Sequence, residues 1–255
     1  MKYFIVSDVH SNWEALMTPL KEAGYEEENP NHTLIVAGDL FDRGEDSLRI
    51  YQWIKNHPRV ILVRGNHETL FQHLVRVQCP SYVDYPNGTM KTAYDLTAGT
   101  KQQTVNFLES KILQEVAFWI QTTFVDYVEF DKYIIVHSSY PQVEDYHNAS
   151  SKEWDKSTWV NPFITRRTIK PEKTVIVGHW GVADAWSKKL NKKLDYENLS
   201  PEFQQIYVDP DINIIGLDNT TICTNRCLVY TIETDETPKL GLTGAEHIIK
   251  ERARN

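Results

Sequence analysis

Three short apolar runs in the first part of the chain each end in a cluster of polar side chains. The runs cover residues 3–6, 34–37 and 60–63. Between them, apolar side chains recur at helical spacing over residues 13–20 and 48–54. This alternation predicts βαβ units with a largely parallel sheet. Because parallel strands end at the same edge of a sheet, the polar clusters are expected to meet there, where α/β folds place their ligands.

The remaining sequence predicts further strands and a single domain over residues 1–255, since no repeat or linker interrupts it. Strands are expected at residues 124–130, 133–137, 174–177, 213–217 and 227–232, and a helix over about 101–120. The first two of these strands form a predicted hairpin, and the second half of the chain is expected to be antiparallel. Residues 79–99 break the periodicity with Pro, Gly, Asn and Thr, and we interpret them as a loop or small cap over the site.

Charge and hydropathy exclude several classes of function. The chain has 27 Lys or Arg against 35 Asp or Glu, and its formal net charge of −8 repels a nucleic-acid backbone. We therefore expect no stable nucleic-acid partner. The amino terminus offers only four consecutive apolar residues, too few for a signal sequence or a membrane span, so we expect a cytoplasmic protein without a membrane partner. Three cysteines without a CxxC pair argue against a disulfide framework.

The polar clusters contain residue types that bind metal ions. Asp8 and His10 follow the first run, and in extended backbone two side chains two positions apart point the same way. Alone, this pair is more often a helix cap beside an exposed histidine. The second run is followed by GDLFDRG at residues 38–44, and the third by RGNHE at residues 64–68. Three successive strands that deliver such residues to one edge predict a metal-dependent active site.

Two later histidines, His137 and His179, also end apolar runs. With them, the sequence from Asp8 to His179 resembles the calcineurin-like metallophosphoesterase superfamily, and the motifs GDLFDRG and RGNHE together are highly specific. The resemblance is closest to the phosphoprotein phosphatase branch, which includes phage and bacterial serine/threonine phosphatases and symmetrical diadenosine tetraphosphatases. It implies an α/β fold in four layers, a sandwich of two mixed β-sheets flanked by helices.

The resemblance also implies two divalent metal ions with defined ligands. The first ion would be held by Asp8, His10 and Asp39, and the second by Asp39, Asn66, His137 and His179. Asp39 would bridge them, because a shared carboxylate screens two cations that lie close together. Such cations would attract phosphate to an acidic protein. Manganese is the expected metal, and the nitrogen and oxygen ligands also suit iron, zinc, cobalt or nickel.

The same family pattern implies catalytic roles for His67, Asp42 and Arg43. A carboxylate at Asp42 would hydrogen-bond His67 and favour the imidazolium, so that His67 can protonate the departing oxygen. A structural His-Asp pair is the alternative. Arg43 would grip the phosphoryl oxygens with its forked guanidinium, and Asn66 would contact the substrate as well as a metal.

Three charged positions near these motifs are less clearly assigned by the sequence. Arg166 or Arg167 is expected to supply a second phosphate-binding arginine from the irregular stretch 152–170, but a solvated basic pair fits equally well. Arg64 and Glu68 either support the site from behind or are a loop charge and a helix-start acid.

The expected reaction is hydrolysis of phosphomonoesters by a metal-bridging hydroxide, with phosphoserine or phosphothreonine in a phosphorylated protein as the substrate. Hydrolysis of dinucleoside polyphosphates, a nucleotide-type substrate, is the alternative. A metal-binding scaffold without turnover is a third reading, which the three catalytic candidates oppose. Ser11 stands where the branch usually has glycine, and Ser138 and Ser139 replace two further glycines, so bacterial or phage enzymes are the better comparison. The sequence leaves the oligomeric state open.

Overall fold

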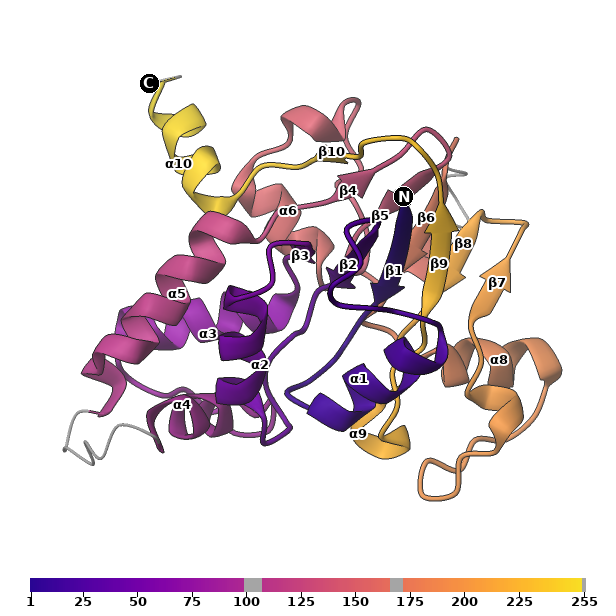
Figure 1. Ribbon diagram of the computed structural model, residues 1–255, viewed down its shortest axis with the longest axis horizontal. Helices are drawn as coiled ribbons and strands as arrows, with labels where there is room; N and C mark the ends of the chain where they lie inside the picture. Colours follow the sequence, from indigo (N-terminus) through magenta and orange to yellow (C-terminus); the bar gives the residue numbers. More distant parts are fainter. Residues whose placement is uncertain (99–106, 166–171, 254–255) are drawn as a thin grey trace.

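Two β-sheets form the centre of the molecule, with helices on their outer faces (Figure 1). The computed structural model describes residues 1–98, 107–165 and 172–253. Within these ranges the strands are β1 (Lys2–Val6), β2 (His32–Ala37), β3 (Val60–Val63), β4 (Val128–Glu129), β5 (Tyr133–Ile135), β6 (Thr174–Val177), β7 (Tyr207–Asp209), β8 (Ile214–Gly216), β9 (Tyr230–Glu233) and β10 (Lys239–Leu240).

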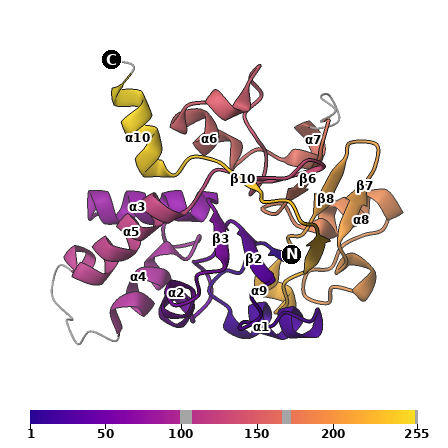
Figure 2. The same cartoon turned by 45° about the horizontal axis from the view of Figure 1, so that its top comes forward.

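The helices fall mostly between the strands, as the alternation in the sequence requires. The α-helices are α1 (Trp13–Glu22), α2 (Ser47–Lys55), α3 (Asn66–Val77), α4 (Thr89–Ala98), α5 (Lys111–Thr123), α6 (Ser151–Ser157), α7 (Pro162–Thr165), α8 (Val182–Leu190), α9 (Thr221–Thr224) and α10 (Gly244–Arg252). Short 3₁₀ helices are η1 (Phe107–Glu109), η2 (Tyr146–Asn148) and η3 (Pro201–Phe203). Figures 1 and 2 show α2 to α5 gathered on one side of the molecule, with α8 and β7 on the other.

The first sheet is built mainly from the amino-terminal strands. Its order is β3-β2-β1-β9, in which β1, β2 and β3 are parallel and β9 is antiparallel to β1. The register brings Val6 beside Val36, and Val36 beside Leu62. The parallel pairing predicted from the three apolar runs is confirmed, and the polar motifs that follow them meet at one sheet edge.

The second sheet is mixed, with the order β10-β4-β5-β6-β8-β7. The predicted hairpin is confirmed as β4 and β5, but β5, β6 and β8 pair in parallel. The expectation of an antiparallel second half is therefore wrong for the centre of this sheet. Parallel neighbours need long crossovers, and the segments containing α6 with α7, and then α8, supply them.

Alternating side chains place each sheet between two cores. Phe4 of β1 packs in the core beneath helices α1 to α5, whereas its neighbour Ile5 meets Ile176 of β6 between the sheets. Val177, the next residue of β6, packs with Trp154 of α6 on the far face of the second sheet. This order of helices, sheet, sheet and helices confirms the predicted four-layer fold.

Some segments differ from the sequence-based expectation. Residues 89–98 form helix α4 in the stretch predicted as a loop or small cap, and most of the described part of 152–170 lies in α6 and α7. The helix expected from about residue 101 begins at Lys111, while residues 99–106 lie outside the described ranges. Across the described ranges, every helix is too short or too polar to cross a membrane.

Candidate metal centre

The polar motifs follow the strand ends in unusual backbone conformations. Asp8, His10, Asp39 and His179 have φ angles of 51°, 49°, 54° and 64°, in the left-handed region that non-glycine residues seldom occupy. Each such residue costs about 1–3 kcal/mol, and strain of this kind clusters at functional sites. Backbone hydrogen bonds between the loops hold it in place, from Asp8 N–H to the Gly38 carbonyl and from His10 N–H to the Asp39 carbonyl.

Two glycines allow side chains of the site to approach the backbone closely. A Cβ atom at Gly38, where φ is 83°, would overlap the imidazole of His137. A Cβ atom at Gly178 would overlap the carboxylate of Asp8. Both positions therefore need glycine because of what lies against them.

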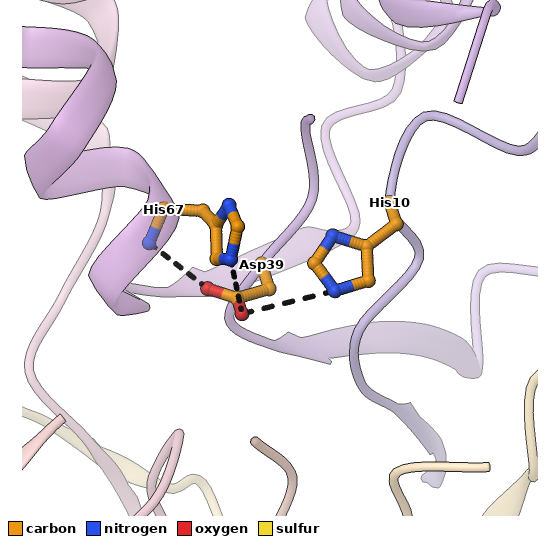
Figure 3. A group of neighbouring side chains, drawn as sticks. All are labelled: His10, Asp39 and His67. Carbon is orange, nitrogen blue, oxygen red and sulfur yellow. Dashed lines mark hydrogen bonds and ion pairs between the residues drawn. The ribbon is translucent and has the colours of Figure 1, made fainter. Parts of the chain in front are cut away.

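Asp39 lies at the centre of the site, between His10 and His67 in Figure 3. Its Oδ2 is 4.0 Å from His10 Nε2 and 3.8 Å from His67 Nε2, and its Oδ1 is 3.3 Å from His137 Nε2. Asp39 belongs to two groups of side chains close enough to share an ion, one with His10 and His67, the other with His137 and His179. A carboxylate common to two groups can act as a bridging ligand.

Hydrogen bonds orient two of these histidines. His10 Nδ1 lies 3.0 Å from the Phe41 carbonyl, and His137 Nδ1 lies 2.9 Å from the Ala37 carbonyl. A carbonyl only accepts, so Nδ1 carries the proton in both rings and Nε2 faces Asp39. Metal-binding histidines are usually fixed in this way through their other ring nitrogen.

Asn66, His179 and Asp8 complete the set predicted to bind metal. Asn66 Oδ1 is 2.9 Å from His137 Nε2, and the rings of His137 and His179 are 5.0 Å apart. Asp8 Oδ2 accepts the backbone N–H of His179 at 2.9 Å. Asp8 is buried but belongs to neither of the two groups around Asp39. In the group with His10, the third member is His67, whereas the sequence predicted Asp8.

Burial and charge set the protonation of these side chains. Burial lowers the pKa of His10 and of His179 to about 3, so both imidazoles are neutral and can offer a lone pair. Burial opposes the charged forms of Asp39 and His137, but the surrounding charges and hydrogen bonds together outweigh it: the pKa of Asp39 falls well below its usual range and that of His137 rises to about 10. A cation that binds there must displace the proton of His137.

His67 is held by a buried carboxylate that helix α4 supports. His67 Nδ1 lies 2.7 Å from Asp42 Oδ2, and Asp42 also accepts hydrogen bonds from the hydroxyls of Thr89 and Thr92 at 2.8 and 2.7 Å. Burial opposes protonation of His67, but Asp39 and Asp42 outweigh it and raise the pKa. Neither threonine was predicted from the sequence, in which their only signal is a spacing of three residues.

Arg43 reaches into the centre from the loop after β2. Its guanidinium nitrogens lie 2.9 Å from His10 Nε2 and 3.2 Å from His67 Nε2. The side chain is partly buried, so its charge acts at short range on any group beside these two rings. A guanidinium in this place is suited to binding phosphoryl oxygens.

Glu68 and Arg64 differ in their relation to the centre. Glu68 is fully buried and accepts the N–H groups of Asp39, Leu40 and Gly65, so it shapes the loop that carries Asp39. Burial raises its pKa to about 7. Arg64 instead forms ion pairs with Asp126 and Asp155.

The predicted arginines at 166 and 167 lie outside the described residues. Among the described side chains, the donors fit a pair of divalent cations. This fit comes from the shared carboxylate of Asp39 and from the Nε2 atoms of His10 and His137, whose tautomers are set by backbone carbonyls.

Several known proteins are similar to this chain. The asymmetrical bis(5′-nucleosyl)-tetraphosphatase of Bacillus velezensis is 34% identical over 84 residues, which make up 29% of this chain and about a third (34%) of that protein's length. A crystal structure described as a candidate diadenosine tetraphosphatase has a TM-score of 0.55 at 14% identity and covers 94% of both chains. The cold-active protein-tyrosine phosphatase of a psychrophilic Shewanella species has a TM-score of 0.54 at 15% identity, covering 94% of this chain and 80% of the other.

Because the two solved structures share only 14% and 15% of their residues with this chain, their similarity shows the fold alone. The family assignment rests on the sequence, because residues 1–215 match the calcineurin-like phosphoesterase family. That family implies a binuclear centre of divalent metals and hydrolysis of phosphate esters, in agreement with the two side-chain groups around Asp39. The chain therefore belongs to the calcineurin-like phosphoesterases.

Proposed function

We propose that this protein hydrolyses phosphomonoesters whose leaving group is an alkoxide. This class includes the phosphoserine and phosphothreonine residues of proteins that the sequence predicts, and also nucleoside 5′-phosphates. The observation that carries the proposal is the buried His67–Asp42 pair beside Asp39, because an alkoxide is a poor leaving group and needs a proton donor.

The ligands in this proposal are those predicted from the sequence: Asp8, His10, Asp39, Asn66, His137 and His179. Two divalent cations held by them, with manganese as the proposed metal, would lower the pKa of water and polarise the phosphoryl oxygens. Two of the six ligands carry negative charge, so a pair of divalent cations leaves the site positive. This local charge would attract a phosphate to a protein whose net charge is −8.

His67 supplies the proton in this scheme. Its Nδ1 is bonded to Asp42, so Nε2 is the nitrogen that faces Asp39 and the reacting groups. Asp39 and Asp42 raise the pKa of His67 against the effect of burial, and this favours the protonated ring. Asp42 orients the imidazole and does not itself need to exchange a proton.

Arg43 binds the phosphoryl group in this scheme. Its guanidinium lies against His10 and His67, between a proposed metal ligand and the proposed acid. Two parallel N–H groups on a planar fork match two phosphoryl oxygens, and the same charge stabilises the transition state.

The variant His67→Asn tests the proposal. It keeps a polar side chain but cannot carry the proton, so kcat/KM on a phosphoserine peptide should fall about 10²-fold or more. The fall should be clearly smaller on p-nitrophenyl phosphate, whose phenolate leaves without protonation. Metal content, measured by elemental analysis, should remain unchanged.

A matched control is His73→Asn, which changes an exposed histidine of the same helix that bonds only Arg76 among the contacts described. It should leave both activities near those of the original protein. Equal losses on both substrates in His67→Asn, with metals retained, would show that His67 is not the leaving-group acid. No turnover of any phosphoester by the manganese-loaded protein would instead favour a non-catalytic scaffold.

Hydrolysis of dinucleoside polyphosphates is the second candidate. It is favoured by the similarity to the bis(5′-nucleosyl)-tetraphosphatase, although that match covers a third of the relative. Here the leaving group is a nucleotide phosphate, which departs without a proton donor. His67→Asn should then retain most of its activity on diadenosine tetraphosphate, and the substrate comparison separates the two candidates.

A further inference from the structure

A cavity of about 510 Å³ lies beside the candidate metal centre, among α7, α8 and β7. Trp180 connects the two places, because it follows His179 in the chain and also lines the cavity. Its ring stands edge-on to the His179 ring, with the centroids 5.5 Å apart and an interplanar angle of 87°.

Trp180 is 39% exposed, and among the described residues only Trp159 is a more exposed tryptophan. Phe163 and Tyr207 line the same cavity and contact each other edge to face at 5.3 Å. The cavity therefore presents aromatic surface next to the proposed phosphoryl site, where the organic part of a substrate would extend.

Polar groups surround this aromatic surface. Asp184 and Asp211 contribute carboxylate oxygens, and the exposed Lys188 contributes an ammonium group. Carboxylates accept hydrogen bonds from hydroxyl and amino groups, whereas an apolar peptide side chain would cover them without any such bond. A flat ring with hydroxyl or amino donors at its edges satisfies both the aromatic and the polar parts of the lining.

We propose that this cavity holds the nucleoside part of the substrate, with the base stacked on Trp180 and the hydroxyl or amino donors of the nucleoside bonded to the carboxylates. The inference rests on the proposed function, and it narrows the alkoxide class to nucleotides. Aromatic side chains stack on any nucleobase because every base has a π-face. We therefore expect the cavity to bind nucleosides in general, with little preference for one particular base.

The test compares two phosphomonoesters with the same kind of leaving group. Adenosine 5′-monophosphate and glycerol 3-phosphate both release a primary alkoxide, so the metal centre treats them alike and the cavity distinguishes them. In Trp180→Ala, the ratio of kcat/KM for the adenosine compound to that for the glycerol compound should fall about 10-fold, the size expected from loss of base stacking. Trp180→Phe should restore part of the ratio, since it keeps an aromatic face.

Trp159 offers a matched control. It is 48% exposed, and its ring stands edge-on to His179 with the centroids 5.9 Å apart, but it does not line the cavity. Trp159→Ala should leave the ratio unchanged. Equilibrium dialysis with adenosine provides a readout that does not depend on turnover, and adenosine should bind more weakly to Trp180→Ala than to Trp159→Ala.

The outcomes separate this inference from the proposed function. If glycerol 3-phosphate is hydrolysed but Trp180→Ala leaves the substrate ratio and adenosine binding unchanged, the nucleoside cavity is wrong and the phosphoesterase stands. If adenosine binds in a Trp180-dependent way but no phosphoester is hydrolysed, the cavity is supported and the proposed function fails. If phosphoserine peptides depend on Trp180 and adenosine 5′-monophosphate does not, the cavity holds a peptide side chain and the inference is overturned.

Discussion

At the scale of single residues, Asp39 contacts several other members of the candidate centre through both its carboxylate and its backbone. Three imidazoles face its carboxylate, and its backbone N–H is bonded to Glu68. Its own φ of 54° is maintained by these contacts and by the hydrogen bond that its carbonyl accepts from the His10 backbone N–H. Charge at this one position therefore affects every other member of the site.

Asp39→Asn should reduce the metal content below two ions per chain and lower activity to near background. The amide keeps an oxygen for the His67 backbone N–H but removes the negative charge that screens two cations. Elemental analysis after dialysis against manganese measures the effect. Glu45→Gln, which neutralises an exposed acid of the same loop, is the control and should bind metal normally. Two bound ions and substantial turnover in Asp39→Asn would contradict the bridging role.

At the scale of secondary structure, helix α4 supports the proposed acid, His67. This helix lies in the stretch predicted as a loop or small cap. Its buried face contains Met90, Ala93 and Leu96 but also Thr89 and Thr92. Counting threonine as polar hides this helical pattern in the sequence. The two hydroxyls bind opposite oxygens of Asp42, so the helix acts on the site by positioning a carboxylate.

Replacing Thr89 by Ala and Thr92 by Val together should lower kcat on a phosphoserine peptide about 10-fold, the size seen when groups that orient a functional side chain are removed. The loss should be smaller on p-nitrophenyl phosphate. The substitutions disturb the orientation of His67, and p-nitrophenolate leaves without the proton that His67 donates. Thr97→Ala is the control on the same helix, since its hydroxyl donates to the Ala93 and Tyr94 carbonyls and is not a partner of Asp42. Identical losses on both substrates would point to a general disturbance of the fold.

At the scale of the whole molecule, a buried polar network connects α10 to Arg64, the first residue of the motif that follows β3. Asp126 accepts from Arg64 at 2.8 Å and lies 2.6 Å from His247 Nε2 of α10. All three residues are buried. Helix α10 stands beside α5 at one end of the molecule (Figure 2), so this network is a long-range connection between distant parts of the sequence.

Asp126→Ala should lower the free energy of unfolding by about 3–5 kcal/mol, because it leaves the buried Arg64 charge and His247 without this partner. Urea denaturation followed by circular dichroism measures the change. Glu115→Ala removes the partner of Lys111 in an exposed pair on α5 and should cost less than about 1 kcal/mol. A loss in Asp126→Ala no larger than in this control would show that the network adds little to stability.

Local sequence signals predicted the three parallel strands of the first sheet and the polar motifs that follow them. The strands β1, β2 and β3 are continuous apolar runs, and such runs are typical of strands buried on both faces. Each is followed at once by its polar motif, so the position of Asp39 and Asn66 at one edge follows from parallel pairing alone. The remaining histidines, His137 and His179, follow β5 and β6 of the second sheet and lie close to Asp39.

Other features depended on contacts between residues far apart in the chain. The parallel pairing of β5, β6 and β8 is set by crossovers through α6 to α8, and no local pattern distinguishes it from an antiparallel meander. The support of Asp42 by α4 joins residues about 50 positions apart. The cavity beside His179 needs α7, α8 and β7 to come together. Hydrophobic periodicity reports which residues are buried, but the partners against which they are buried are chosen by the packing of the whole chain.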